Sequence, residues 1–150
     1  MLIRTHLAIT FLFVLLFLPK VVHLTFFVFF SLFATMLPDI DSSFSKIGKR
    51  KIFRIIQLFV KHRGILHSFL FLFFITWVLI LFFPFLAFPF FLGYGLHLIA
   101  DSFTIKGIRI FYPFKKTYSG PIKTGTRKET IIFLLFLSAD LFILASIIFK

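Results

Sequence analysis

The stretch of the sequence with the most chemical potential is Lys61-His62-Arg63-Gly64-Ile65-Leu66-His67-Ser68, in which two imidazoles and a guanidinium precede a long apolar run. The chain has only five His and five acidic residues. Seven of these lie at the edges of apolar segments, namely His6, Asp39, Asp41, His62, His67, His97 and Asp101. Scattered polar residues would not collect at segment ends in this way, so we expect these groups to meet on one side of a membrane.

Imidazole and carboxylate groups together are the ligands of zinc, manganese or iron. The chain has no cysteine, so a metal ion must be held by these groups alone. His97 and Asp101 are four residues apart, which places them on the same face of a helix, where they can share an ion. Asp39 and Asp41 can point the same way in an extended turn. All seven groups are candidate ligands, sufficient for one catalytic ion or for a pair about 3.5–4 Å apart.

Such an ion would lower the pKa of a bound water to about 7 and supply hydroxide at neutral pH. Arg63 lies beside the candidate ligands, and its planar fork can clamp a phosphate or carboxylate through two hydrogen bonds, which Lys does less well. Arg63 and Asp39 are therefore the candidate catalytic residues, with Asp39 also a candidate ligand.

Several of these residues also have a purely structural interpretation. Asp39 and Asp41 can simply cap or end helices. A lone His at a membrane interface often contacts headgroups, and we interpret His23 in this way. Asp140, inside the last apolar run, marks a buried or functional contact. Glu129 is interpreted as an ordinary interfacial charge.

The composition indicates an integral membrane protein. Apolar residues make up 60% of the 150 residues, compared with roughly 45–50% in soluble domains. Five apolar runs approach or reach the length of a membrane-spanning helix, about 17–25 residues. We therefore predict an all-α membrane protein with a single domain. The expected membrane-spanning segments are about 5–18, 21–37, 65–83, 85–101 and 130–149.

The two long connections between these segments are basic. Residues 42–61 contain Lys and Arg but no acid, and their apolar residues recur at helical spacing, which predicts an amphipathic helix in the headgroup plane. Residues 103–129 are predicted to form extended pieces and turns. We also expect a turn from Pro84 to Pro89 and close helix packing at Gly93 and Gly95.

The distribution of charge predicts the orientation. With five crossings, residues 1–5, 38–64 and 103–129 share one side and hold 15 of the 17 Lys and Arg. This asymmetry predicts a multi-pass protein of the cell membrane (inner or plasma) with its N-terminus and long loops in the cytoplasm. We ascribe the net charge of +12 to this topology and to attraction to anionic lipid headgroups in the bilayer. No nucleic-acid partner is expected.

The same residues resemble the YdjM-like family of membrane-bound metal-dependent hydrolases. The resemblance covers roughly residues 1–125, although Ile9-Thr10-Phe11 departs from the family's pattern of a small residue and Gly after the first His. The matching pieces are Thr5-His6-Leu7-Ala8, Leu37-Pro38-Asp39-Ile40-Asp41, His62-Arg63-Gly64-Ile65-Leu66-His67-Ser68 and Gly95-Leu96-His97-Leu98-Ile99-Ala100-Asp101-Ser102-Phe103-Thr104. The resemblance implies a metal-dependent hydrolase.

Our leading hypothesis is a hydrolase whose divalent ion activates water, with zinc the first candidate and manganese or iron the alternatives. Arg63 would bind an anionic group of a phospholipid or another membrane-associated phosphoester. The expected ligands are His62, His67, His97 and Asp101, helped by Asp39 and Asp41. The alternative is a non-catalytic membrane protein in which the His/Asp cluster, with or without metal, fixes helix packing. A cation transporter ranks last, because the first four segments carry almost no polar groups across the bilayer.

Overall fold

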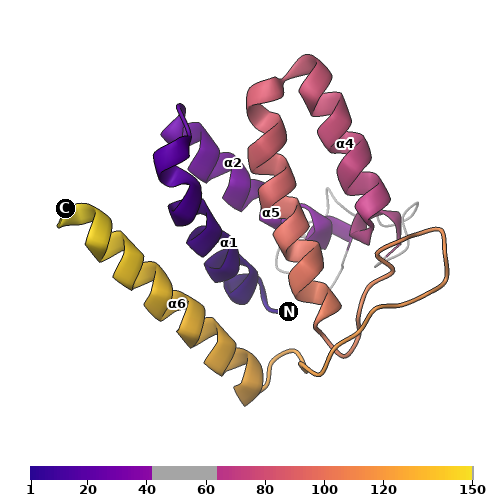
Figure 1. The fold of residues 1–150 in the computed structure, drawn as a ribbon. Coiled ribbons are helices and arrows are strands. Elements are labelled where there is room, and N and C mark those ends of the chain that lie inside the picture. The colour runs from indigo at the N-terminus through magenta and orange to yellow at the C-terminus, as the bar shows by residue number, and fades with distance from the viewer. Residues whose placement is uncertain (42–63, 150) are drawn as a thin grey trace.

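A computed structural model of the chain describes residues 1–41 and 64–149 (Figure 1). Within these ranges the protein is all-helical and contains no strand, which confirms the predicted fold class. The α-helices are α1 (Ile3–Phe17), α2 (Leu24–Met36), α4 (Phe69–Phe82), α5 (Pro84–Ser102) and α6 (Arg127–Ile148). Short 3₁₀ turns, η1 (Leu18–Lys20), η2 (Pro38–Asp41) and η4 (Ile65–His67), lie at helix ends. The amphipathic helix predicted over residues 42–61 lies outside the described residues.

Four helical segments are long and apolar enough to cross a membrane, and α4 is a shorter apolar helix. The four segments are Ile3–Lys20, Leu24–Asp41, Pro84–Ser102 and Arg127–Ile148. Large apolar side chains such as Phe29, Trp77 and Phe142 are exposed on these helices. Such a surface fits hydrocarbon, where a helix satisfies its own backbone hydrogen bonds. The protein is therefore a helical membrane protein.

Helix α5 is the centre of the bundle (Figure 1). It packs between α2 and α4 and also touches α1, whereas α6 packs mainly along α1. The closest approach lies at Gly93 of α5, where an added Cβ would stand 2.0 Å from the carbonyl oxygen of Ser31 in α2. The predicted close packing is therefore confirmed at Gly93. A Cβ on Gly95 would make only an ordinary contact, 3.4 Å from Leu72.

The ends of α4 and α5 follow from local chemistry. Helix α4 begins at Phe69, because the Ser68 hydroxyl caps it by accepting from the Phe71 N–H at 3.3 Å. Pro84 occupies the first turn of α5, where its missing N–H costs nothing. Pro89 lies inside α5. The expected turn from Pro84 to Pro89 is therefore wrong, and the two helices are joined at Phe83 alone.

The segment between α5 and α6 is irregular, as predicted, with two isolated bridges at Thr104–Ile122 and Ile108–Tyr118. The Thr104 hydroxyl donates to the Asp101 carbonyl at 2.7 Å. This contact holds the start of the irregular segment against the end of α5, beside the candidate site.

Candidate metal centre

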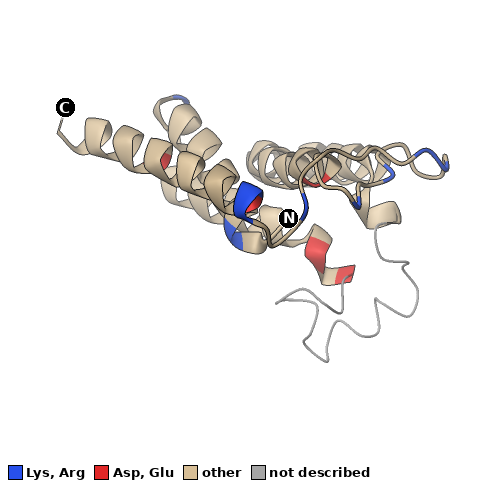
Figure 2. Cartoon of the chain, turned by 90° about the horizontal axis from the view of Figure 1, so that it is seen from below, with Lys and Arg blue, Asp and Glu red and all other residues tan. Residues whose placement is uncertain are grey.

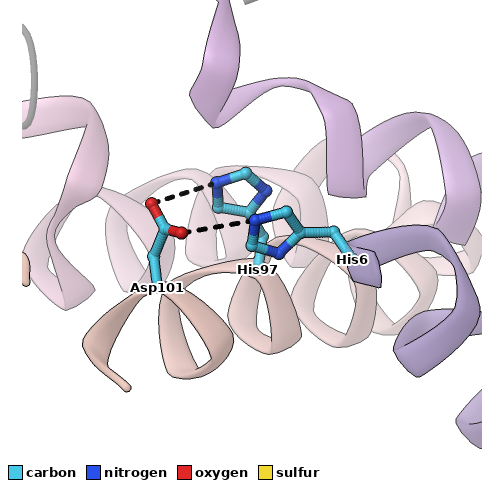
Figure 3. A group of neighbouring side chains, drawn as sticks. All are labelled: His6, His97 and Asp101. Atoms are coloured by element: carbon cyan, nitrogen blue, oxygen red, sulfur yellow. Dashed lines mark ion pairs between the residues drawn. The ribbon is translucent and has the colours of Figure 1, made fainter. Parts of the chain in front are cut away.

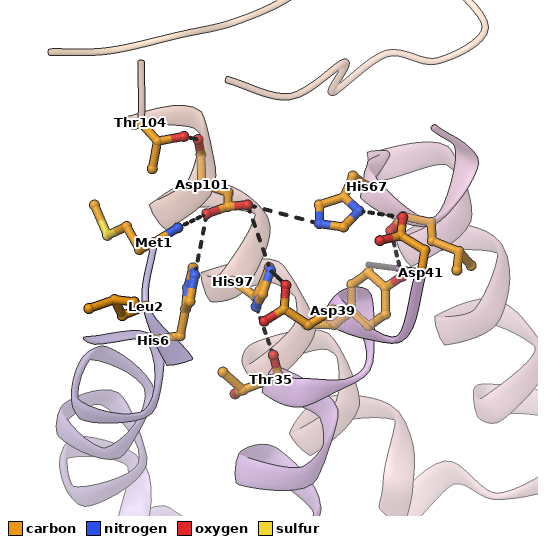
Figure 4. A network of polar contacts seen from close by, with 12 residues as sticks. Met1, Leu2, His6, Thr35, Asp39, Asp41, His67, His97, Asp101 and Thr104 are labelled. Carbon is orange, nitrogen blue, oxygen red and sulfur yellow. Dashed lines mark hydrogen bonds and ion pairs between the residues drawn. The ribbon is translucent and has the colours of Figure 1, made fainter. Parts of the chain in front are cut away.

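The structure brings together all the predicted site residues that it describes, at one end of the helical bundle (Figure 4). These residues come from four elements of the chain. His6 comes from the first turns of α1, Asp39 and Asp41 from η2, His67 from η4, and His97 and Asp101 from the last turns of α5. His62 and Arg63 lie outside the described residues, so their assignments stay predictions.

His97 lies at the middle of the cluster and is fully buried. Its Nδ1 donates to the Thr35 carbonyl oxygen at 2.8 Å, which leaves Nε2 facing the carboxylates. Nε2 lies 3.9 Å from Asp101 Oδ2 and 4.0 Å from Asp39 Oδ1. Both separations exceed hydrogen-bond length, and Nε2 has no hydrogen-bond partner among the described residues. An unsatisfied buried polar atom costs about 1–3 kcal/mol, so a ligand such as a metal ion at this nitrogen would be favourable.

His6 and Asp101 form one side of the cluster with His97 (Figure 3). The His6 and His97 rings stack with centroids 3.9 Å apart and planes 9° apart. His6 Nε2 lies 3.3 Å from Asp101 Oδ1, and the Met1 amino group also donates to that oxygen. The carboxylate of Asp101, almost wholly buried, is therefore surrounded by nitrogen atoms and is stabilised by positive charge.

His67 and Asp41 form the other side. His67 Nδ1 lies 3.0 Å from Asp41 Oδ2, and its Nε2 lies 3.9 Å from Asp101 Oδ2. In metal sites a ligating His usually gives its second ring nitrogen to a carboxylate or a backbone carbonyl, which orients the ring. His67 with Asp41 and His97 with the Thr35 carbonyl both have this arrangement.

The donor set fits a divalent metal. Two groups have ligand atoms that all lie within 4.8 Å of one another, His6 with His97 and Asp101, and Asp39 with His67 and His97. His97 is common to both. Asp41 belongs to neither, since it contacts the far side of His67. The Asp39 side chain is 18% exposed, more than the side chains of Asp101 and the three imidazoles, so Asp39 marks the side of the cluster nearest the surface.

One buried carboxylate near the cluster was not expected. Glu129 is fully buried in the first turn of α6, so its interpretation as an ordinary interfacial charge is wrong. Its two oxygens accept hydrogen bonds from the Leu2 and Gly125 N–H groups, both at 2.5 Å, and from the Thr5 hydroxyl at 3.2 Å. Thr126 followed by Glu129 three residues later has the spacing of a capping box, which predicts the start of α6 but not the burial of Glu129.

The other two polar residues singled out in the sequence lie away from the cluster. His23 is exposed at the start of α2, at the end of that helix opposite Thr35. Asp140 is buried in α6, as predicted, and its Oδ1 has no hydrogen-bond partner among residues 1–41 and 64–149.

The fold and the site together define a class, a helical membrane protein with a buried His/Asp cluster that could hold a metal ion at one end of the bundle. The model of the YdjM inner membrane protein family matches residues 1–149, and the chain belongs to this family. The resemblance noted in the sequence is thus confirmed. No curated protein and no solved structure matches the chain.

Proposed function

We propose that the protein is a membrane-bound, metal-dependent hydrolase whose site lies at the bundle end formed by His67, His97 and Asp101. The observation that carries this proposal is the Nε2 atom of His97. It is fully buried, its ring is fixed by the Thr35 carbonyl, and it faces two carboxylates at 3.9 and 4.0 Å without a hydrogen bond to either. A cation beside these carboxylates is the simplest partner for this nitrogen.

The ion would be held by Nε2 of His97 and His67 and by the carboxylate of Asp101, with a fourth position left for water beside the Asp39 carboxylate. One nitrogen binds one ion, so the two ligand groups that share His97 compete for it. A second ion would therefore depend on His6 and the remaining oxygen of Asp101. Zinc is the first candidate because His and carboxylate, without Cys, are common ligands of catalytic zinc, and manganese and iron are the alternatives.

A bound divalent ion supplies a Lewis acid and a water whose pKa is about 7. The chain's own residues orient the site and move protons. Asp41 and the Thr35 carbonyl hold the two imidazoles, and Asp39, the most exposed of these carboxylates, is placed to accept a proton from an attacking water. Arg63 is proposed to bind the anionic part of the substrate.

The proposed substrate is a phospholipid or another membrane-associated phosphoester. In Figure 2, Lys and Arg lie near the starts of α1 and α6 and along residues 103–126, at the same end as the cluster. Cationic side chains there would attract anionic headgroups and favour a cytoplasmic position for this end. On this basis we also propose that the N-terminus and long loops are cytoplasmic and that the protein resides in the cell membrane.

Metal content of the detergent-purified protein, measured by mass spectrometry, tests the proposal. We expect near-stoichiometric zinc, manganese or iron in the wild type and its loss in His67→Ala and His97→Ala. His23→Ala is the matched control, because it removes an exposed imidazole at the other end of α2 and should leave the metal in place. A wild type that holds no metal, and takes up none when these ions are added, would refute the metal site.

Hydrolysis is tested separately on the metal-loaded protein. A panel of phosphoesters presented in mixed micelles should include a substrate that is cleaved by the wild type and by His23→Ala but not by His97→Ala. Loss of activity on chelation and its recovery on addition of one ion would identify the metal.

A structural role is the second candidate function, and a specific observation favours it. The cluster already links α1, η2, η4 and α5 through the His6–Asp101 and His67–Asp41 contacts, which bury polar groups that would be costly to separate. Under this alternative His97→Ala would lower the unfolding midpoint, and no phosphoester would be cleaved by the wild type.

A further inference from the structure

We propose that Glu129 is a positioning residue for the metal centre, which clamps the first turn of α1 onto α6 and thereby sets His6 against His97 and Asp101. The proposal rests on the metal site proposed above. Glu129 lies outside the ligand groups, and its sequence neighbours Arg127, Lys128 and Thr130 are typical of a helix start at a membrane surface. The hydrogen bonds of its carboxylate indicate this role.

The carboxylate of Glu129 joins two helix starts. One oxygen, Oε1, accepts from the Leu2 N–H at 2.5 Å and from the Thr5 hydroxyl at 3.2 Å, both at the beginning of α1. The other, Oε2, accepts from the Gly125 N–H at 2.5 Å, just before α6. Helix starts carry unpaired N–H groups and partial positive charge, so one buried anion between them stabilises both.

The clamped turn of α1 carries a residue of the cluster. Thr5 directly precedes His6, and Leu2 directly follows Met1, whose amino group donates to Asp101. His6 in turn stacks on His97 at 3.9 Å and approaches Asp101 at 3.3 Å. A second contact keeps the same register, since the Arg4 guanidinium lies 5.1 Å above the Phe133 ring of α6. A shift of this turn would therefore move His6 away from His97 and Asp101.

The substitution Glu129→Gln tests the clamp with little change in volume. The amide can still accept from the α1 donors through its oxygen, but its NH₂ group then faces the Gly125 N–H, so the two-sided contact is lost. Outer contacts of metal ligands typically contribute about 10–100-fold to metal affinity. We expect Glu129→Gln to weaken zinc binding about tenfold, with the larger loss in Glu129→Ala.

Combining variants tests whether Glu129 affects the metal centre through His6. In the His6→Ala background, Glu129→Gln should cause no further loss of zinc affinity, and the visible spectrum of the cobalt-substituted Glu129→Gln protein should shift toward that of His6→Ala. Thr5→Val removes a single α1 donor and should give a smaller effect of the same kind. Thr126→Val is the matched control, because its hydroxyl donates to the Lys123 carbonyl beside the same helix start and not to Glu129. Equal losses with and without His6, or an unchanged cobalt spectrum, would overturn the proposal.

A metal-independent measurement separates this proposal from the proposed function. Hydrogen exchange of the metal-free protein should rise in the first turn of α1 in Glu129→Ala, by about tenfold for one lost clamping contact, and stay unchanged in α4. If the wild type binds no metal but this change occurs, the hydrolase proposal fails and the clamp on His6 stands. If exchange in α1 is the same in Glu129→Ala and the wild type, the clamp is refuted whatever the metal result.

Discussion

Gly93→Ala should damage the metal centre although residue 93 touches none of its ligands. The added Cβ would lie 2.0 Å from the Ser31 carbonyl oxygen, whereas real Cβ contacts start near 3.0 Å, so α2 and α5 must separate by about 1 Å. His97 lies one helical turn further along α5, on the same face, and its ring is held by the Thr35 carbonyl of α2 at 2.8 Å.

The magnitude follows from these two contacts. Overpacking of this size costs about 1–3 kcal/mol, and stretching the His97–Thr35 hydrogen bond beyond about 3.5 Å removes a further 0.5–1.5 kcal/mol. We therefore expect a loss of about 1.5–4.5 kcal/mol in the free energy of unfolding. Because functional sites tolerate displacements of only about 0.5 Å, metal affinity should fall as well.

The assay is equilibrium unfolding in mixed detergent micelles, followed by circular dichroism, together with a zinc titration of the folded protein. Gly95→Ala is the control, since its Cβ would meet Leu72 at an ordinary 3.4 Å and should change stability by less than about 1 kcal/mol. Equal stability of the two variants would refute the close-approach argument. A destabilised Gly93→Ala that keeps wild-type zinc affinity would refute the link between helix separation and the site.

Three further predictions concern single groups. Asp41→Asn should lower zinc affinity about tenfold while leaving the bound stoichiometry intact, because Asp41 orients His67 from outside the ligand set; complete loss of metal, as in His67→Ala, would make Asp41 a ligand instead. Asp140→Leu should raise the unfolding midpoint, because it removes a buried carboxylate with an unsatisfied oxygen from an apolar helix; a lower midpoint would reveal a polar partner for Asp140. Lowering the pH from about 8 to about 5 should release the metal, because ligating imidazoles must be neutral. Mass spectrometry after gel filtration at each pH measures the metal content, and unchanged occupancy at the lower pH would contradict the prediction.

Much of this protein could be predicted from the sequence, because the controlling signals are local. A run of apolar residues long enough to cross a bilayer forms a helix wherever it occurs, and helix ends follow from capping residues such as Ser68. Those ends also carry the polar groups, so His6, Asp39, His67, His97 and Asp101 could be assigned to one face once the crossings were counted. The family resemblance pointed to the same residues.

The tertiary structure determined which atoms each polar group contacts, because these contacts join distant parts of the chain. Glu129 meets Leu2 across 127 residues, a distance over which no periodicity carries information, and this contact turns an expected surface charge into a buried clamp. In the same way, packing of α5 on η2 and η4 sets Asp41 behind His67 and leaves Nε2 of His97 facing two carboxylates. The sequence indicated which polar residues lie at the helix ends. The packing of the helices, closest at Gly93, determined which of their atoms point inward.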